Sequence, residues 1–195
     1  TKKVRGGEGS EEEVSELVQA DMAESFLGNR LLTSMVAGAP TSPSVRKFIR
    51  ECFDLLLVDA YGNTESGTGS IAFNGKIQSP PVTEYKLKDV PELGYYTTDK
   101  PYPRGELCYK SVVGIRGYYK QPEASADLFD EEGFSLTGDI VEERSPGHIV
   151  VCDRRKDVIK LSQGEYVAIG NLATQFESGS AAIKQIFLYG NPLQS

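Results

Sequence analysis

Apolar residues near the start of the chain recur every three or four positions, which predicts a helix. Ser10 and the three glutamates after it are typical of a helix start, because acidic side chains favour the positive end of the helix dipole. Gly28 ends the pattern. The residues at helical spacing are Val14, Leu17, Val18, Met22 and Phe26.

Two short apolar runs flank a second helical pattern. Leu31–Val36 and Leu55–Val58 are predicted to be buried strands, and Ser42 or Ser44 can cap the helix between them. The inner face of that helix is expected to consist of Val45, Phe48, Ile49, Cys52 and Phe53. Residues 14–62 therefore contain a β-α-β element, with parallel strands and a right-handed connection.

The pattern changes near residue 70. Short runs rich in β-branched and aromatic residues follow, broken by Gly or Pro about every ten positions, as in Val82–Leu87, Gly105–Tyr109 and Ile149–Cys152. This predicts a small antiparallel or barrel-like β unit, with a short helix over Glu123–Phe129.

The charged stretch 153–157 separates two apolar strands and predicts a domain boundary. After the strand Val158–Leu161 we expect a helix over residues 169–178 and a strand over 185–189. Both chain ends are interpreted as cuts in a longer protein.

The fold class is thus α/β plus β, in four parts. Residues 1–69 are the end of a parallel α/β subdomain, and 70–152 form a β-rich subdomain. Residues 153–157 are a hinge, and 158–195 begin an incomplete α+β subdomain.

Composition narrows the function classes. A net charge of −7 disfavours non-specific binding to nucleic acid or anionic lipid, and with no apolar run of 18 residues no membrane span is expected. Cys52, Cys108 and Cys152 are widely spaced, which disfavours a disulfide framework or zinc site and favours a reducing cytoplasm. His148 follows a Ser-Pro-Gly turn and is expected to be a surface residue.

The segment from Tyr61 to Gly67 follows a predicted buried strand, at the end where open α/β sheets bind ligands. Its glycines let backbone N–H groups approach phosphate, Thr64 can donate to a phosphate oxygen, and Glu65 offers the oxygen ligand that Mg²⁺ prefers. Tyr61 offers a flat face for a base. A polar hairpin without a ligand explains the same residues.

Two further segments carry candidate chemistry. In Leu136-Thr137-Gly138-Asp139, a carboxylate after a tight glycine turn can accept hydrogen bonds from vicinal hydroxyls. In the segment from Asp153 to Val167, Lys160 lies within an apolar strand and can reach a developing negative charge, although such a charge run is often a solvated face.

Together the three segments resemble the adenylate-forming superfamily of acyl-CoA synthetases, peptide-synthetase adenylation domains and luciferases. The stretches V-P-E-L-G-Y-Y-T-T-D-K-P-Y-P-R-G-E-L, G-Y-Y-K-Q-P-E and K-L-S-Q-G-E-Y-V-A look most like the adenylation domain of carboxylic acid reductases, followed by long-chain acyl-CoA ligases. The likeness extends from about residue 30 to 195.

The resemblance implies roles at the nucleotide. Gly38, Ala39 and Pro40 would help wall the adenine and acyl pocket, and Tyr61, Gly62 and Asn63 would pack on adenine. Thr64 would contact the α-phosphate and Glu65 would hold Mg²⁺.

It also implies roles for later residues. Asp139 and Arg154 would hold the ribose hydroxyls, Lys156 and Asp157 would form the hinge, and Lys160 would face the site in a second, thioester-forming conformation. The family's phosphate loop and second catalytic lysine lie outside the chain, so the chain by itself is expected to be inactive.

The implied activity is ATP-dependent formation of an acyl-AMP from a small carboxylic acid. The acyl group would then pass to a phosphopantetheine thiol on a carrier-protein domain, or to CoA; a reductase would use NADPH in a separate domain. The alternatives are a long-chain acyl-CoA synthetase, a non-catalytic β-rich binding module, and a nucleotide-dependent oxidoreductase prompted by Gly67-Thr68-Gly69.

Overall fold

The computed structural model describes residues 11–28, 30–39, 41–161, 166–180, 182–183 and 185–189. The chain divides into two compact units, Thr1–Asp59 and Ala60–Ser195. None of the helices in the described ranges has the length and hydropathy that a transmembrane helix requires.

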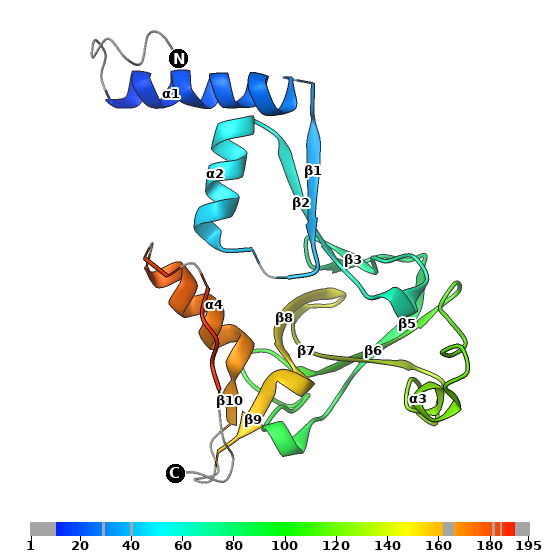
Figure 1. The fold of residues 1–195 in the computed structure, drawn as a ribbon. Helices are drawn as coiled ribbons and strands as arrows, with labels where there is room; N and C mark the ends of the chain where they lie inside the picture. The colour runs from blue at the N-terminus through cyan, green and yellow to red at the C-terminus, as the bar shows by residue number, and fades with distance from the viewer. Residues whose placement is uncertain are drawn as a thin grey trace. The chain divides into compact units, whose positions relative to one another are not determined.

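The first unit contains the predicted β-α-β element (Figure 1). The start of β2 lies beside the start of β1, because Leu56 N–H donates to the Leu32 carbonyl at 3.0 Å and the Thr33 hydroxyl donates to the Leu56 carbonyl at 2.9 Å. The two strands run in the same direction, with α2 crossing between them, so the parallel arrangement is confirmed. The elements are α1 (Glu11–Met22), the π-helical turn η2 (Ala23–Leu27), β1 (Thr33–Ala37), α2 (Pro43–Phe53) and β2 (Leu56–Tyr61).

Local sequence explains the ends of these helices. The Ser42 side chain accepts from Val45 N–H and Pro43 occupies the first turn, so α2 begins where its orphan N–H groups are satisfied. Gly28 adopts the left-handed conformation that ends η2. Arg46 on α2 forms an ion pair with Asp59 on β2, which ties the helix to the strand.

The second unit is built on antiparallel pairing, as the spacing of its short strands predicts. The last residues of β2 pair with β3, and the order continues β3-β4-β8-β7-β6-β5. The strands are β3 (Ala72–Phe73), β4 (Lys76–Ile77), β5 (Val82–Lys88), β6 (Arg104–Ser111), β7 (Ser135–Ser145) and β8 (His148–Arg154). Short helices accompany them: η3 (Thr64–Ser66), η4 (Pro91–Leu93), α3 (Pro122–Ala126) and η5 (Arg155–Asp157).

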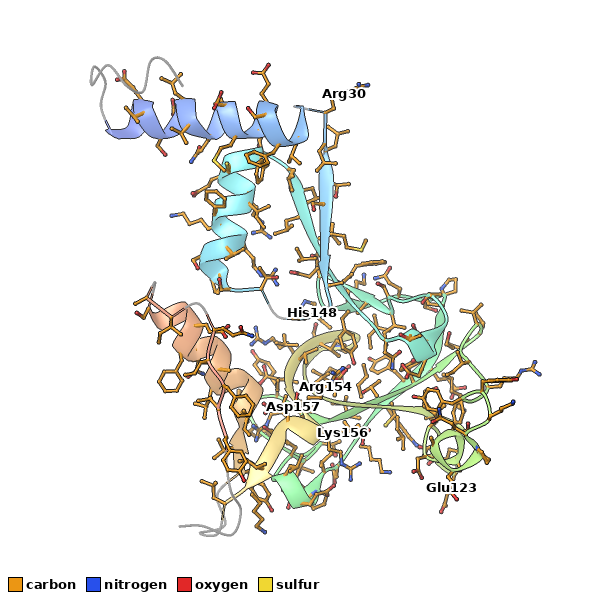
Figure 2. The ribbon with its side chains drawn as sticks, viewed as in Figure 1. Arg30, Glu123, His148, Arg154, Lys156 and Asp157 are labelled. Carbon is orange, nitrogen blue, oxygen red and sulfur yellow. The ribbon has the colours of Figure 1, made fainter. Side chains whose placement is uncertain are left out.

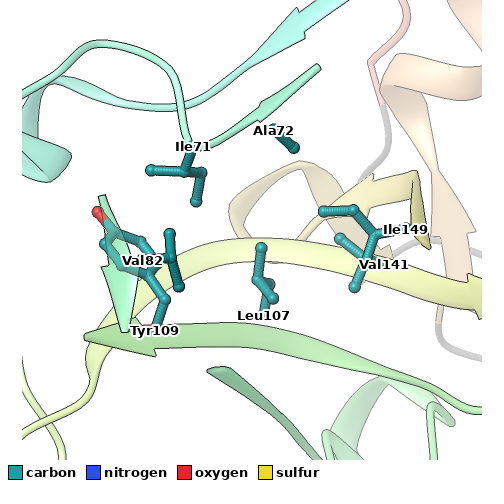
Figure 3. Packing of buried hydrophobic residues seen from close by; sticks show 7 residues of the cluster. All are labelled: Ile71, Ala72, Val82, Leu107, Tyr109, Val141 and Ile149. Atoms are coloured by element: carbon teal, nitrogen blue, oxygen red, sulfur yellow. The ribbon is translucent and has the colours of Figure 1, made fainter. Parts of the chain in front are cut away.

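The core of this unit lies among β3, β5, β6, β7 and β8 (Figure 3). Full burial of side chains of this kind contributes about 1.5–3 kcal/mol each, so the cluster fixes the strand register on which the polar residues depend. The cluster consists of Ile71, Ala72, Val82, Leu107, Tyr109, Val141 and Ile149.

The Thr137-Gly138-Asp139 segment differs from the expectation of a tight turn. It lies inside β7, and Gly138 has φ +70° within the strand. The β6–β7 and β7–β8 ladders shift register beside it, between Glu106 and Cys108 and between Ile140 and Val141. Such an irregularity re-aims the side chains next to it, which supplies the geometry that we expected from a turn.

The chain continues into β9 (Val158–Lys160), β10 (Tyr166–Ala168) and α4 (Ile169–Gly179). β9 and β10 pair antiparallel, and the predicted helix over residues 169–178 is confirmed. The predicted strand over 185–189 is wrong: these residues form no strand, because a strand needs a ladder partner and the described chain supplies none. His148 is half-buried at the start of β8 rather than on an exposed turn.

Candidate functional site

Two residues from separate segments donate hydrogen bonds to one carboxylate, that of Asp139. Tyr61 donates its hydroxyl proton to Asp139 Oδ2 at 2.9 Å, and Arg154 Nε donates to Asp139 Oδ1 at 2.9 Å. Asp139 and Arg154 are direct register partners across β7 and β8, and Tyr61 ends β2. The strand pairing therefore brings together three of the predicted site residues.

The carboxylate is enclosed while the arginine faces outward. Asp139 is 6% exposed, whereas the Arg154 side chain is 62% exposed. A carboxylate has about four lone-pair sites, and each oxygen here accepts one bond from these partners, so acceptor capacity remains. Arg154 uses Nε in this pair, so among the described residues its terminal nitrogens are left to donate elsewhere.

The electrostatics follow from this enclosure. Burial, and then the neighbouring Asp139 charge, raise the pKa of Tyr61 well above its ordinary value. The hydrogen bond to Asp139 raises the pKa of Arg154. Tyr61 is therefore a neutral donor and Arg154 a cation at any physiological pH.

The loop after Tyr61 is held by its own polar groups. The Asn63 side chain caps the one-turn helix η3 by accepting from Ser66 N–H at 3.1 Å, and it also accepts from the Tyr109 hydroxyl at 2.8 Å. Ser66 is fully buried and donates to the Asn63 carbonyl. Thr64 is at the start of this turn, and its hydroxyl makes no hydrogen bond within the described part of the chain.

Two glycines permit a close approach of backbones around this loop. A Cβ on Gly62 would lie 2.4 Å from the Gly69 carbonyl oxygen, and one on Gly67, at φ +77°, would lie 1.9 Å from the Val113 carbonyl oxygen. Gly69 has a similar φ of +73° with open space around it. The loop is therefore fixed against the segment that follows β6.

Glu65 presents a carboxylate at the exposed side of the loop. The Tyr118 hydroxyl donates to Glu65 Oε1 at 2.6 Å, and this bond raises the pKa of Tyr118. Ile115 N–H donates to the Glu65 carbonyl at 3.0 Å, which fixes the backbone. Among the described residues no three His, Cys, Asp or Glu side chains cluster as a metal cage. A single protein carboxylate is enough for Mg²⁺, whose other ligands are usually water molecules and phosphate oxygens of the substrate.

The remaining predicted residues lie elsewhere. Lys156 and Asp157 are the last two residues of η5, which begins at Arg155, directly after the end of β8 at Arg154 (Figure 2). Lys160 ends β9, where its ammonium group lies 5.1 Å from the centre of the Tyr166 ring, and in the described part of the chain no hydrogen bond or ion pair joins it to Asp139.

The other residues, which we predicted to line the adenine and acyl pocket, lie in the first unit. Gly38, with φ +88°, and Ala39 follow β1, while Pro40 lies outside the described residues.

The sequence interpretation missed Glu106. It is 2% exposed on β6, where it accepts from Gly138 N–H at 2.9 Å and from Arg155 Nη1 at 3.2 Å. A signal was available: the glutamate stands next to Leu107 inside the predicted strand-like run Gly105–Tyr109. A carboxylate enclosed there must be paired, because an isolated buried charge is too costly.

The sequence of this chain is similar to those of known proteins. Residues 11–119 match the family described as AMP-binding enzyme. A carboxylic acid reductase of Segniliparus rugosus is 48% identical over 181 residues, which are 93% of this chain and 15% of that protein. Fatty acyl-CoA synthetase A of Dictyostelium discoideum is 40% identical over 176 residues, 87% of this chain and 26% of that protein.

A solved structure extends the match to three dimensions. The A domain of carboxylic acid reductase from Segniliparus rugosus, in complex with AMP and a co-purified carboxylic acid, superposes with a TM-score of 0.86 at 45% identity. The match covers 100% of this chain and 30% of that one. This chain thus spans less than a third of the length of these relatives.

Proposed function

The chain belongs to the AMP-binding enzyme family, and we propose that it is part of a longer ATP-dependent enzyme that activates a carboxylic acid. In this reaction a carboxylate oxygen bonds to the α-phosphorus of ATP, the bond to the β-phosphate breaks, and acyl-AMP and pyrophosphate form. The observation that carries the proposal is the convergence of Tyr61, Asp139 and Arg154. The proposal is also supported by the similarity to an A domain whose structure was solved in complex with AMP.

In this proposal Asp139 and Arg154 bind the ribose. The spare lone pairs of the Asp139 carboxylate accept the two vicinal hydroxyl protons, and the terminal nitrogens of Arg154 donate to the ribose oxygens. Tyr61 keeps the carboxylate oriented through its phenol hydrogen bond and offers its ring to adenine. Because Asp139 is buried, these hydrogen bonds form away from bulk water, in an environment where hydrogen bonds are stronger.

The loop from Gly62 to Glu65 would hold the phosphates. Its fixed backbone presents N–H groups, and the Thr64 hydroxyl is available to donate to an α-phosphate oxygen. Glu65 would hold Mg²⁺, which supplies charge neutralisation when bound. The chain thereby contributes positioning and electrostatic stabilisation, which are what phosphoryl-group chemistry needs most.

We extend the proposal to the later part of the chain. Lys156 and Asp157 form a hinge between the β-rich subdomain of residues 70–152 and the α+β part beginning at 158. For the second half-reaction the part of the chain after the hinge rotates. In that rotation Lys160 leaves Tyr166 and contacts the acyl adenylate instead. Gly38, Ala39 and Pro40 wall the pocket.

The acyl acceptor is proposed to be a phosphopantetheine thiol on a carrier-protein domain of the same enzyme, as in a carboxylic acid reductase. The thiol sulfur bonds to the acyl carbon and AMP leaves; NADPH then reduces the thioester in a separate domain. The 48% identity to a carboxylic acid reductase favours this version.

A second candidate is a fatty acyl-CoA synthetase, in which CoA takes the acyl group. The observation that favours it is 40% identity to a fatty acyl-CoA synthetase. The two candidates share the first half-reaction and differ only in the acceptor.

Exchange of labelled pyrophosphate into ATP tests the shared step. The complete protein that carries this chain should exchange label when given Mg²⁺ and a fatty or aromatic carboxylic acid, and only then. Addition of NADPH without CoA should yield an aldehyde for the reductase, whereas an acyl-CoA formed only with CoA identifies the synthetase. Absence of exchange with every acid tried would refute the proposed function.

A further inference from the structure

The residues on either side of Arg154 are held by contacts of their own. Arg154 has extended backbone, with φ −114° and ψ 127°, so Asp153 and Arg155 point away from the side on which Arg154 meets Asp139. Each of these two neighbours bonds to the loop that joins β5 to β6, or to β6 itself.

Arg155 bridges two carboxylates. Its Nη1 donates to Glu106 Oε2 at 3.2 Å, and its Nη2 pairs with Glu92 on η4. Glu106 is 2% exposed, and its second oxygen accepts from Gly138 N–H, the residue before Asp139. One buried carboxylate therefore contacts both the backbone that aims Asp139 and the side chain that follows Arg154.

Asp153 is held from the same loop. The Tyr95 hydroxyl donates to Asp153 Oδ2, and the Tyr95 ring packs against the Arg104 guanidinium at 4.9 Å from the ring centre. A bridge between Val90 and Tyr95 closes the loop, so Glu92 and Tyr95 belong to one small fixed structure.

We propose that Glu106, Glu92 and Tyr95 are positioning residues that anchor Asp153 and Arg155. The anchor aims Arg154 at the ribose, and it confines any swivel to Lys156 and the residues after it. Its effect on the nucleotide rests on the proposed function, whereas the anchoring itself does not.

The arrangement explains how a hinge can lie next to a binding residue. If Arg155 were not held, movement of the last part of the chain would rotate Arg154 away from Asp139. Because two carboxylates hold Arg155, the torsional change falls on Lys156 and Asp157, which follow it.

Limited trypsin digestion tests the anchor without reference to activity, because trypsin cleaves after Arg154, Arg155 and Lys156. In the complete protein we expect E92Q/E106Q to be cut at this segment at least threefold faster than the unaltered protein. The control is Glu142→Gln, which removes the partner of Arg144 on β7 and should not change the rate. If the double variant does not fold, E92Q alone should give at least a twofold increase, since Glu92 is half-exposed.

ATP kinetics test the link to Arg154. In E106Q the glutamine oxygen still accepts from Gly138 N–H, but the anion facing Arg155 is lost, so KM for ATP should rise about fivefold while kcat changes less than twofold. Tyr95→Phe should act in the same direction. A purely structural role would lower the folded fraction and hence kcat, without changing KM.

The outcomes separate the two proposals. Faster cleavage together with a raised KM for ATP supports the anchor. An active parent protein whose variants keep the original cleavage rate or the original KM overturns the anchor alone. If the parent protein shows no pyrophosphate exchange, the proposed function is overturned. In that case faster cleavage of the double variant still supports the anchoring of Arg155, and an unchanged cleavage rate overturns the anchoring as well.

Discussion

Asp139 is the residue on which the described contacts of Tyr61 and Arg154 converge, and its enclosure determines what these contacts are worth. Hydrogen bonds to a charged group contribute about 1.5–3 kcal/mol, more than neutral ones. Tyr61 and Arg154 orient the Asp139 carboxylate before any ligand arrives, so a ribose would meet an acceptor that is already in position.

Replacement of Asp139 by Asn should weaken ATP binding more than tenfold. The amide keeps one acceptor oxygen for Tyr61 but loses the charge that faces Arg154 and one of the two acceptors proposed for ribose. Isothermal titration of the complete protein with ATP measures the change. Asp130→Asn, which removes a different carboxylate paired with Lys86 at 2.8 Å, serves as the control and should leave ATP affinity unchanged. Unaltered affinity in the Asp139 variant would exclude the ribose assignment.

Tyr109 predicts a dependence of stability on alkaline pH. Burial raises the pKa of Tyr109 from 10.0 to about 12. Between these two pH values the Tyr109 phenol is ionised in the unfolded chain but still protonated in the folded one. The contribution of this phenol to the free energy of unfolding is therefore intact below pH 10 and is lost as the pH rises toward 12. Urea unfolding at pH 9 and pH 11 should show a steeper loss in the unaltered protein than in Tyr109→Phe. Equal losses in both proteins would place the phenol in contact with water.

At this scale the sequence motifs singled out Tyr61, Asp139 and Arg154, which the structure brings together, while their roles at a nucleotide stay predictions. The motifs did not predict Glu106 or Tyr118, whose partners Arg155 and Glu65 lie 49 and 53 positions away. Such contacts are set by strand register and loop packing, which local patterns do not encode.

Among the elements, the loop that contains η3 depends on how closely its backbone approaches other segments. Gly67 and Gly69 share a left-handed φ but differ in their surroundings, since only Gly67 faces the Val113 carbonyl. The loop is therefore shaped both by its own capping at Asn63 and by the segment after β6.

Alanine substitutions at these two glycines should differ in cost. Gly69→Ala bears only the left-handed backbone penalty and should lower the free energy of unfolding by about 1 kcal/mol. Gly67→Ala adds a clash with backbone atoms and should lower it by about 3 kcal/mol or more. Urea denaturation of both variants checks the difference. Similar losses at the two positions would mean that the contact with Val113 is absent in solution.

Hydrophobic periodicity predicted most elements, including α1, α2, β1, β2, β8 and α4. Periodicity gave the wrong prediction where strand pairing decides whether a segment forms a strand. Residues 185–189 have an apolar strand pattern but no ladder partner in the described chain, and Gly138 was taken for a turn although it lies within β7. A glycine at positive φ inside a strand gives the same sequence signal as one in a turn.

At the scale of the molecule, the proposed site draws on three separated segments of one β-rich unit, and the chain spans less than a third of its relatives' length. Resemblance to the family predicted the fold class and the family itself, both of which are confirmed. The roles of Thr64, Glu65, Lys160 and the hinge residues remain predictions, because they depend on a bound nucleotide and on a second conformation.

Oxygen tracing tests the central claim most directly. The complete protein should be incubated with Mg²⁺-ATP, a thiol acceptor and a carboxylic acid whose carboxylate carries ¹⁸O, and the released nucleotide should be analysed by mass spectrometry. We predict AMP that contains one ¹⁸O atom, because the carboxylate oxygen bonds to the α-phosphorus and stays with AMP when the thiol takes the acyl group. Unlabelled AMP, or ADP with labelled phosphate, would contradict the formation of an acyl-AMP.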